Sequence, residues 1–417
     1  MRNLFILTTV AVLAGFATVQ SQSAAESPAA ESAGLIVKDG ILHRDGEPYR
    51  GVGANYFDLF YRVLKDGSDT SHDEGLRKLS AADIPFVRFM AGGFWPVYWD
   101  LYLQDKEEYF KRMDAVVRSA EKHNIGLVPS LFWNLATFPD LVGEPMDQLG
   151  NEKSRTIAFI EQYTTELVQR YRNSPAIWGW EFGNEYNLHA DLPNASSHRP
   201  KIVPQLKTGL ERTSRDDLSS DAMLTAFGYF ARTVRKHDAH RILITGNSIP
   251  SRSAFHNSSE KSWKPDNRAQ FESVLRRDNP SPYDVTCVHL YGNDGQGGTK
   301  SISELVETLQ EIAGRTRQPL FIGEFGAPKT LGPEDEKALF IEMLKAIEEN
   351  HVPLSAFWVF DHSGQDKDWN VSFENERAYM LKLVADLNQR MKSTDPTHQA
   401  EKAGAEQPAT APKSKAE

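Results

Sequence analysis

The stretch WGWEFGNEYN, Trp178 to Asn187, decides the fold class. Two Trp, one Phe and two Gly surround two Glu and two Asn, and the run then turns polar. A segment that is apolar on both of its alternating sides is typical of a strand buried on both faces, as in a parallel sheet covered by helices. In α/β enzymes the carboxyl ends of such strands hold the chemistry. The stretch therefore predicts a buried parallel strand with a functional carboxylate, Glu185, at its end.

Similar apolar runs recur along the chain and alternate with helical patterns. The predicted strands are 50–54, 86–90, 126–132, 177–182, 241–245, 285–290, 320–324 and 355–360, and the clearest predicted helices are 106–123, 153–171, 222–236, 303–314, 335–350 and 374–390. Eight strands, each followed by a helix or a long loop, predict a (β/α)8 TIM barrel, preceded by a short N-terminal β-hairpin that begins at Leu35. The alternative is an open doubly wound sheet, and the absence of a glycine-rich phosphate loop after the first strand weakens its dinucleotide-binding form.

Composition limits the class of protein. The chain has 417 residues, of which 40% are hydrophobic and 25% are charged, so one large globular domain is expected. The formal net charge of −10 argues against nucleic acid as a partner, because binding to phosphates requires a basic surface.

The two ends of the chain differ from the central part in composition. Arg2 precedes an apolar run that gives way to small residues, and this pattern predicts a signal peptide over residues 1–25, with an uncleaved anchor as the alternative. A flexible leader is expected at 26–34, the catalytic domain at 35–392 and a disordered tail at 393–417. We therefore expect a secreted or periplasmic monomer with no stable membrane insertion once its signal is cleaved. Its single cysteine, Cys287, excludes an intrachain disulfide.

Polar and aromatic residues gather where the predicted strands end. In chain order these residues are Arg88, Trp133, Asn134, Asn184, Glu185, His289, Tyr291, Glu324 and Trp358. Because the carboxyl ends of barrel strands meet at one face, these side chains are expected to line one pocket for a polar ligand.

Two of these residues are carboxylates on opposite sides of the ring. Glu185 ends the fourth predicted strand and Glu324, within PLFIGEFGAP, ends the seventh. Paired carboxylates beside aromatic rings suit glycoside hydrolysis, in which one protonates the leaving oxygen and the other attacks or assists at the anomeric carbon. For either Glu taken alone, a structural ion pair at a strand end is an equally good interpretation.

These residues carry a family resemblance. The chain resembles glycoside hydrolase family 5, the cellulase and mannanase group, from about residue 35 to 390. The motifs are Asn-Glu after strand four, His-x-Tyr after strand six, Glu-Phe-Gly after strand seven and Trp on strand eight. The resemblance implies a retaining enzyme on a (β/α)8 barrel, with Glu185 as acid/base and Glu324 as nucleophile.

The resemblance also implies roles for the neighbouring residues. Arg88 and Tyr291 would hold the charge and orientation of the nucleophile. Asn184 would bond the 2-hydroxyl of the sugar, His289 would line the same subsite, and Trp358 would form its floor.

Two departures from the family pattern affect the expected substrate. Tyr186 stands where many members have Pro after Asn-Glu, and Trp133-Asn134 occupy the region where many cellulase-like members carry a histidine. Trp133 and Asn134, expected to bind substrate, are faintly similar to the mannanase branch.

The sequence thus predicts an exported retaining β-glycosidase that acts on an oligo- or polysaccharide, with β-1,4-mannan or β-glucan as the preferred substrate. No cofactor is expected, and no catalytic metal, because no His/Asp/Glu cluster has ligand spacing along the sequence. The alternatives are a transglycosylase that uses the same residues and a non-catalytic carbohydrate-binding protein on a hydrolase barrel. Loss of one Glu would have favoured the binding protein, and both are present.

Overall fold

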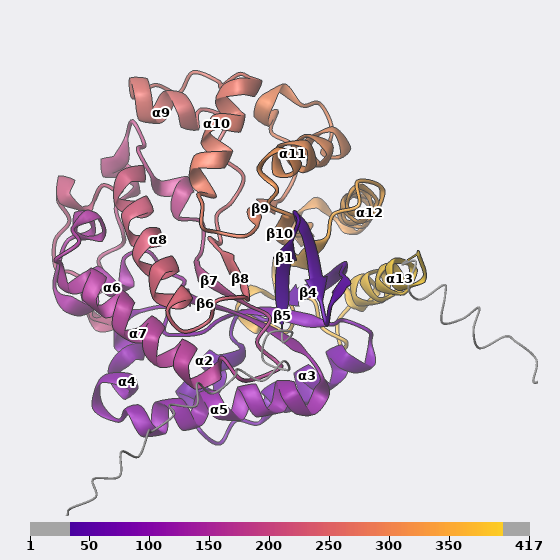
Figure 1. The fold of residues 1–417 in the computed structure, drawn as a ribbon, viewed down its shortest axis with the longest axis horizontal. Helices are drawn as coiled ribbons and strands as arrows, with labels where there is room; N and C mark the ends of the chain where they lie inside the picture. Colours follow the sequence, from indigo (N-terminus) through magenta and orange to yellow (C-terminus); the bar gives the residue numbers. More distant parts are fainter. Residues whose placement is uncertain (1–33, 395–417) are drawn as a thin grey trace, which may run out of the picture.

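Eight parallel strands form the centre of the molecule (Figure 1). The computed structural model describes residues 34–394. The strands are β4 (Gly51–Asn55), β5 (Phe86–Met90), β6 (Gly126–Phe132), β7 (Gly179–Gly183), β8 (Ile242–Ile244), β9 (Thr286–Leu290), β10 (Leu320–Phe325) and β11 (Leu354–Phe357). Their hydrogen-bonded order is β8-β7-β6-β5-β4-β11-β10-β9. This is a sheet rolled nearly into a ring, and the predicted (β/α)8 barrel is confirmed.

The ring closes between β8 and β9 through fewer backbone contacts than elsewhere. The Asp284 N–H donates to the carbonyl of Leu243 at 3.1 Å. Beyond this point the side chain of Asn279 bridges the seam, because its Oδ1 accepts from the Cys287 N–H and from the Thr245 hydroxyl, each at 2.9 Å. A side chain thus takes the place of a strand partner, which is why β8 is only three residues long.

Helices surround the strands in the alternating order that the sequence predicts (Figure 1). They are α2 (Leu59–Lys65), α3 (Ser71–Ala81), α4 (Asp100–Gln104), α5 (Lys106–His123), α6 (Thr137–Val142), α7 (Arg155–Tyr171), α8 (Ser220–Arg235), α9 (Ala254–Glu260), α10 (Arg268–Asp278), α11 (Ile302–Thr316), α12 (Pro333–Glu349) and α13 (Ala378–Thr394). Helix α7 illustrates their construction: the Ser154 side chain accepts from the Ile157 N–H and caps the first turn. Ile157, Ile160 and Leu167 then recur on one face and are buried against the barrel.

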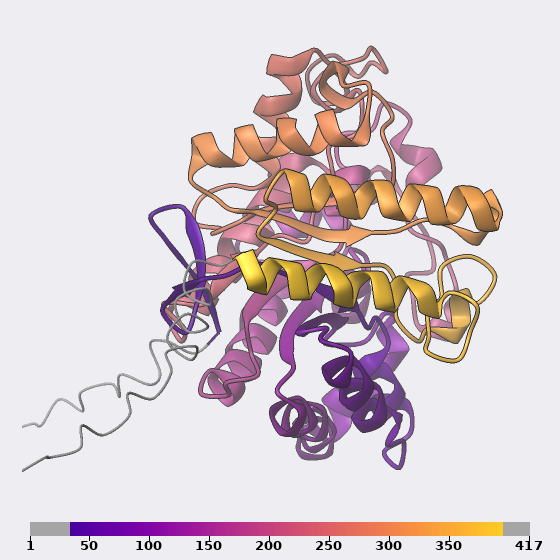
Figure 2. The ribbon, with the colours of Figure 1, turned by 90° about the vertical axis from the view of Figure 1, so that its right-hand side faces the viewer.

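A small antiparallel sheet lies across the amino ends of the barrel strands (Figure 2). It consists of β1 (Leu35–Lys38), β2 (Ile41–Arg44) and β3 (Glu47–Pro48). The Leu35 N–H donates to the carbonyl of Trp178 at 2.8 Å, and the guanidinium of Arg44 lies 4.2 Å from the centre of the Trp178 ring. The predicted N-terminal hairpin is confirmed, and it covers the end of the barrel opposite the predicted site.

Several predictions about the chain ends lie outside the described residues. These are the signal peptide at 1–25, the leader at 26–34 except Gly34, and the part of the tail at 393–417 that follows Thr394. Within 34–394, no helix is long and apolar enough to cross a membrane. The limits of the catalytic domain, 35–392, remain a prediction.

Candidate active site

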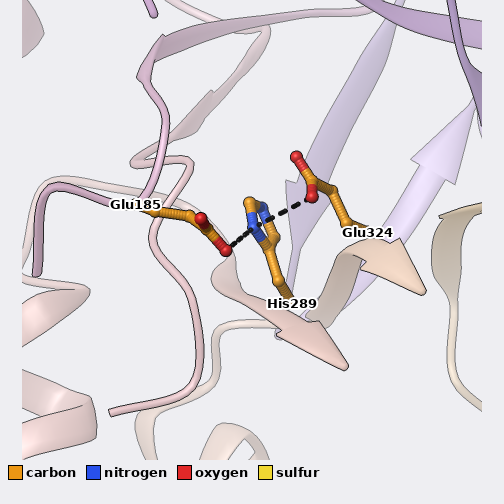
Figure 3. Close-up of side chains that lie close together, drawn as sticks. All are labelled: Glu185, His289 and Glu324. Carbon is orange, nitrogen blue, oxygen red and sulfur yellow. Dashed lines mark hydrogen bonds and ion pairs between the residues drawn. The ribbon is translucent and has the colours of Figure 1, made fainter. Parts of the chain in front are cut away.

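Glu185 and Glu324 meet at the carboxyl ends of the strands, with His289 between them (Figure 3). A carboxylate oxygen from each Glu and one ring nitrogen of His289 all lie within 4.8 Å of one another. His289 Nδ1 lies 2.9 Å from Oε1 of Glu185 and 3.6 Å from Oε2 of Glu324. The structure therefore brings the two sequence-predicted carboxylates together around His289.

The backbone at Glu185 is held in an unusual conformation. Glu185 has a φ of +53°, in the left-handed region, and its N–H donates to the carbonyl of Gly246 at 2.8 Å. Gly246 has a φ of +74°, and a Cβ there would lie 1.8 Å from the carbonyl oxygen of Gly183. Only glycine permits this approach of the β8 loop to the end of β7, and the approach fixes the direction in which Glu185 leaves its strand.

Glu324 is aimed by a bulge in β10. Pairing with β9 runs from Ile322 opposite Val288 directly to Glu324 opposite His289, so that Gly323 is the extra residue. A Cβ on Gly323 would lie 3.1 Å from Nε2 of His289, tighter than most such contacts. β-Bulges commonly redirect a side chain beside an active site, and this one places Glu324 against the His289 ring.

Two groups stabilise the charge of Glu324. Arg88 donates from Nη1 to Oε1 at 2.7 Å, and the Tyr291 hydroxyl donates to Oε2 at 2.5 Å. The Glu324 side chain is 5% exposed, whereas that of Glu185 is 28% exposed. Both Glu324 oxygens are thus engaged by donors in a dry environment, where such bonds are strong.

Arg88 is fully buried and contacts three further residues. Its Nη2 donates to Oδ1 of Asn184 at 2.8 Å, its Nη1 to Oδ1 of Asn55 at 2.9 Å, and its Nε to both oxygens of Glu181 at 2.9 and 2.8 Å. Sequence reasoning missed Asn55 and Glu181. Glu181 stands inside the apolar strand β7, and nothing in its spacing along the sequence indicated a contact with Arg88.

Aromatic rings cluster beside Arg88, and one of them, Trp133, lines the cavity next to Glu185. The guanidinium of Arg88 lies 4.4 Å from the centre of the Trp133 ring, and the Trp133 and Trp358 rings are 6.0 Å apart. Phe57 contacts both rings, with centroids at 5.1 and 5.9 Å. The Trp358 indole N–H donates to Gln365 at 2.8 Å, which fixes its plane. Phe57, which follows β4 and precedes Asp58, was not singled out in the sequence.

The side-chain polar atoms of Asn134, a predicted site residue, are hydrogen-bonded to the backbone. Its amide nitrogen donates to the carbonyl of Phe94 at 3.1 Å, and its Oδ1 accepts from the Ala136 N–H at 3.2 Å. The first bond joins the β5 and β6 loops, and the second lies within the β6 loop. Asn134 nevertheless lines the same cavity as Glu185.

That cavity has a volume of about 520 Å³ and lies beside Glu185, between the loops that follow β5, β6 and β7. A larger hollow, of about 790 Å³, lies at the amino ends of the strands, between the hairpin and helices α11 and α13. None of the predicted site residues lines the larger hollow. Its position at the end opposite the carboxylates separates it from the chemistry.

The two carboxyls have unequal pKa values. Burial raises the pKa of Glu324 above its usual value, although Arg88 and the Tyr291 hydroxyl oppose the rise. Burial also raises the pKa of Glu185, but the hydrogen bond from His289 and the charge of Arg88 outweigh it, so this pKa lies below its usual value. His289 Nε2 is buried without a partner among the described residues, so we assign the ring proton to Nδ1, which donates to Glu185.

The same three side chains are the group within residues 34–394 that could hold a metal ion. Two carboxylates and an imidazole form a reasonable ligand set for a divalent transition metal. The sequence did not reveal this cluster, because its members come from three separate strand ends. Each of the three is already hydrogen-bonded within the protein.

Comparison with known proteins places this geometry in context. The family model described as "Cellulase (glycosyl hydrolase family 5)" matches residues 64–364, more than half of the chain. A probable mannan endo-1,4-beta-mannosidase F from Aspergillus flavus is 29% identical over 163 residues, and the match spans 34% of each protein's length. A mannan endo-1,4-beta-mannosidase F from Aspergillus clavatus is 34% identical over 82 residues, 18% of each chain.

Solved structures show the same fold at low identity. The endo-1,4-beta-mannanase from Rhizomucor miehei has a TM-score of 0.61 and 17% identity, with 86% of this chain and 100% of that chain covered. The GH5_18 protein from Streptomyces cattleya, solved with GlcNAc, has a TM-score of 0.58 and 16% identity, with 84% and 82% covered. With the family model matching most of the barrel, this chain belongs to glycosyl hydrolase family 5.

Proposed function

We propose that the protein is a secreted β-glycoside hydrolase that retains the anomeric configuration by double displacement. The observation that supports this most strongly is the separation of Glu185 and Glu324, whose carboxylate oxygens lie within 4.8 Å. Retaining enzymes hold their two carboxyl groups about 5–5.5 Å apart, whereas inverting enzymes need roughly 6.5–9.5 Å to admit a water. A separation this short favours direct attack by a carboxylate over activation of a water.

In the first step, Glu324 is the nucleophile. A carboxylate oxygen attacks the anomeric carbon, the bond to the leaving oxygen breaks, and Glu185 transfers its proton to that oxygen. Arg88 and Tyr291 keep Glu324 ionised and fix its orientation. Glu185 has neither contact, and this difference supports the assignment of the two roles.

Glu185 must carry a proton at the start of this step. In the free enzyme its pKa is low, and its side chain is partly exposed. A sugar that covers Glu185 removes the remaining solvent, and desolvation favours the neutral acid. Binding of the substrate therefore raises the pKa of the residue that has to donate the proton.

In the second step, water resolves the glycosyl-enzyme. Esterification removes the negative charge of Glu324, so Glu185 loses a like-charged neighbour and its pKa falls. Glu185 then takes a proton from the incoming water, whose oxygen attacks the anomeric carbon and releases Glu324. If another sugar replaces this water, the same residues perform transglycosylation.

Four other residues are proposed to bind the sugar. Asn184 Oδ1 accepts from Arg88, so its amide nitrogen is the group available to bond the 2-hydroxyl. Trp133 and Trp358 offer apolar faces for ring stacking, with Trp358 as the floor, and Asn134 lies at the edge of the cavity beside Glu185. His289 holds Glu185 in place through Nδ1.

The proposed substrates are β-1,4-mannan and β-glucan. Mannanases among the relatives and among the similar folds support the first, and the family description supports the second. We further propose one catalytic domain at 35–392, export by way of the N-terminal segment, and a monomer.

The test is a screen of purified protein against mannan, glucomannan, cellulose, xylan and β-1,3-glucan, with sizing of the products. Glu324→Gln serves as the matched inactive control. We expect one or more β-glycans to be cut by the native enzyme and none by the variant. Absence of cleavage, together with retardation by one of the glycans in affinity electrophoresis, would replace the proposal with a carbohydrate-binding role.

A further inference from the structure

Glu181 is a buried carboxylate that the proposed mechanism does not use. It lies in the middle of β7 and is 0% exposed, and Arg88, also 0% exposed, is its salt-bridge partner. Burial of a carboxylate is costly unless the charge is paired and hydrogen-bonded. Its partner is the same guanidinium that contacts Glu324, so one cation serves two buried carboxylates.

The Nε edge of the Arg88 guanidinium and its two terminal nitrogens bind different partners. Its Nε faces Glu181 alone, and both Glu181 oxygens accept from it. The two terminal nitrogens then face Glu324, Asn184 and Asn55. Because a guanidinium is planar and its donors have fixed directions, holding the Nε edge determines where the other two nitrogens point.

We infer that Glu181 is a positioning residue. It orients Arg88 toward the nucleophile, and it forms an ion pair with the same guanidinium that contacts Glu324. This inference rests on the proposed function, because it assigns Glu181 an effect on Glu324. Glu181 does not reach the sugar itself, and it acts only through Arg88.

The negative charge of Glu181 affects the basicity of Glu324. This charge opposes the field of Arg88 at Glu324, so the nucleophile is more basic than it would be beside Arg88 alone. Neutralising residue 181 removes this opposing charge, which favours the ionised form of Glu324. The titratable and charged groups facing this pair are Arg88 from β5, Cys287 and His289 from β9, Tyr291 after β9, and Glu185 after β7.

The test is Glu181→Gln, which preserves shape and an acceptor for Nε but removes the charge. We expect the acidic side of the pH profile of kcat/KM, its acid limb, to move to lower pH by about one unit. This is the low end of the pKa shift that a nearby charge causes. We also expect kcat at the plateau to fall by about three- to tenfold, since a less basic carboxylate is a weaker nucleophile and a neutral residue 181 holds the Nε edge of Arg88 less firmly.

A matched control separates this effect from lost stability. Asp238 is another buried carboxylate, which lies 2.9 Å from Arg241 just before β8, at the amino ends of the barrel strands. Asp238→Asn should lower the melting temperature without moving the acid limb. Glu181→Asp, which retains charge with a shorter reach, should keep the wild-type limb and lose kcat, and it serves as the second variant if Glu181→Gln does not fold.

Two outcomes would overturn the inference: an unchanged acid limb and kcat in folded Glu181→Gln, or wild-type kcat in folded Glu181→Asp. Either leaves the proposed function intact, because the wild-type enzyme would still cleave its glycan. Failure of the wild-type enzyme on every β-glycan would instead refute the proposed function and the inference that rests on it.

Discussion

Glu185 and Glu324 bring carboxylate oxygens within 4.8 Å of each other, yet only Glu324 is bonded to Arg88 and Tyr291. Enzymes give two carboxylates different roles, acid and nucleophile, by placing them in different surroundings. Here the inequality arises from the fold, because Tyr291 follows β9, the neighbour of β10, and Arg88 reaches Glu324 from β5 across the ring, whereas Glu185 stands in the β7 loop. These contacts support the proposed roles, although the pKa directions in the free enzyme, raised for Glu324 and lowered for Glu185, mean that the bound sugar has to reverse their order.

Replacing Glu185 should affect substrates according to their leaving groups. Glu185→Ala removes the proton donor, so cleavage of a polysaccharide or an alkyl glycoside should fall by about 10²–10⁴-fold. An aryl glycoside with an acidic phenol needs no proton, so its first step should be nearly unaffected. A burst of phenol followed by slow turnover checks this, and an equal loss for both substrates would contradict the role.

Tyr291→Phe should slow the reaction and shift its pH dependence. Loss of a hydrogen bond to a charged group costs about 1.5–3 kcal/mol, or roughly 10- to 150-fold in kcat/KM. Activity requires ionised Glu324 and is lost as the pH falls through its pKa, which burial raises. Because the Tyr291 hydroxyl lowers this pKa, its removal should move the acid limb to higher pH, opposite to Glu181→Gln.

A distant tyrosine is the control for that shift. Tyr109 is buried and its hydroxyl lies 2.7 Å from that of Tyr163, away from the carboxylates. Tyr109→Phe should leave the acid limb where it is. A shift of equal size in both variants would show that the effect of Tyr291 is not local.

Metal ions should inhibit rather than activate. Since Glu185, His289 and Glu324 can act together as ligands, added Zn²⁺ should reduce activity, and less so at low pH, where the ligands are protonated. Chelator alone should leave the rate unchanged. Loss of activity on chelation and its restoration by a divalent ion would contradict a metal-free mechanism.

Two glycines should differ in how substitution by alanine changes the stability of the fold. A Cβ at Gly126 would lie 2.1 Å from the Trp178 ring, so Gly126→Ala should destabilise the fold by about 1–3 kcal/mol through overpacking. Gly314 lies in α11, where an added Cβ would meet no neighbouring atom within 4 Å, and Gly314→Ala should stabilise by about 0.5–1 kcal/mol. Denaturant unfolding measures both, and similar effects would contradict the packing.

The fold was predictable because its signals are local. Each barrel strand is a short apolar run, and the predicted ranges match the observed strands to within a few residues. Strand β8 shows why the ends differ, because it is predicted at 241–245 and observed at Ile242–Ile244. It is shortened because the side chain of Asn279 serves as the partner across the seam, a contact that apolar periodicity does not record.

The site was predictable only in part, because polar contacts inside a barrel join residues far apart in sequence. Glu185 and Glu324 were found from their positions at strand ends, but Glu181 was hidden inside an apolar strand. Asn134, which is proposed to bind the sugar, lines the cavity beside Glu185, and its amide also bonds the backbone of the β5 and β6 loops. Such use of a side chain depends on loop geometry that spacing along the chain does not reveal.

The most direct test of double displacement is the configuration of the fresh product, followed by proton NMR during the first minutes of hydrolysis. Attack by Glu324 and then by water inverts the anomeric carbon twice, so the product should carry the β configuration of the substrate before mutarotation. We predict that the β anomer appears first and the α anomer only later. Initial release of the α anomer would contradict the assignment of Glu324 as the nucleophile.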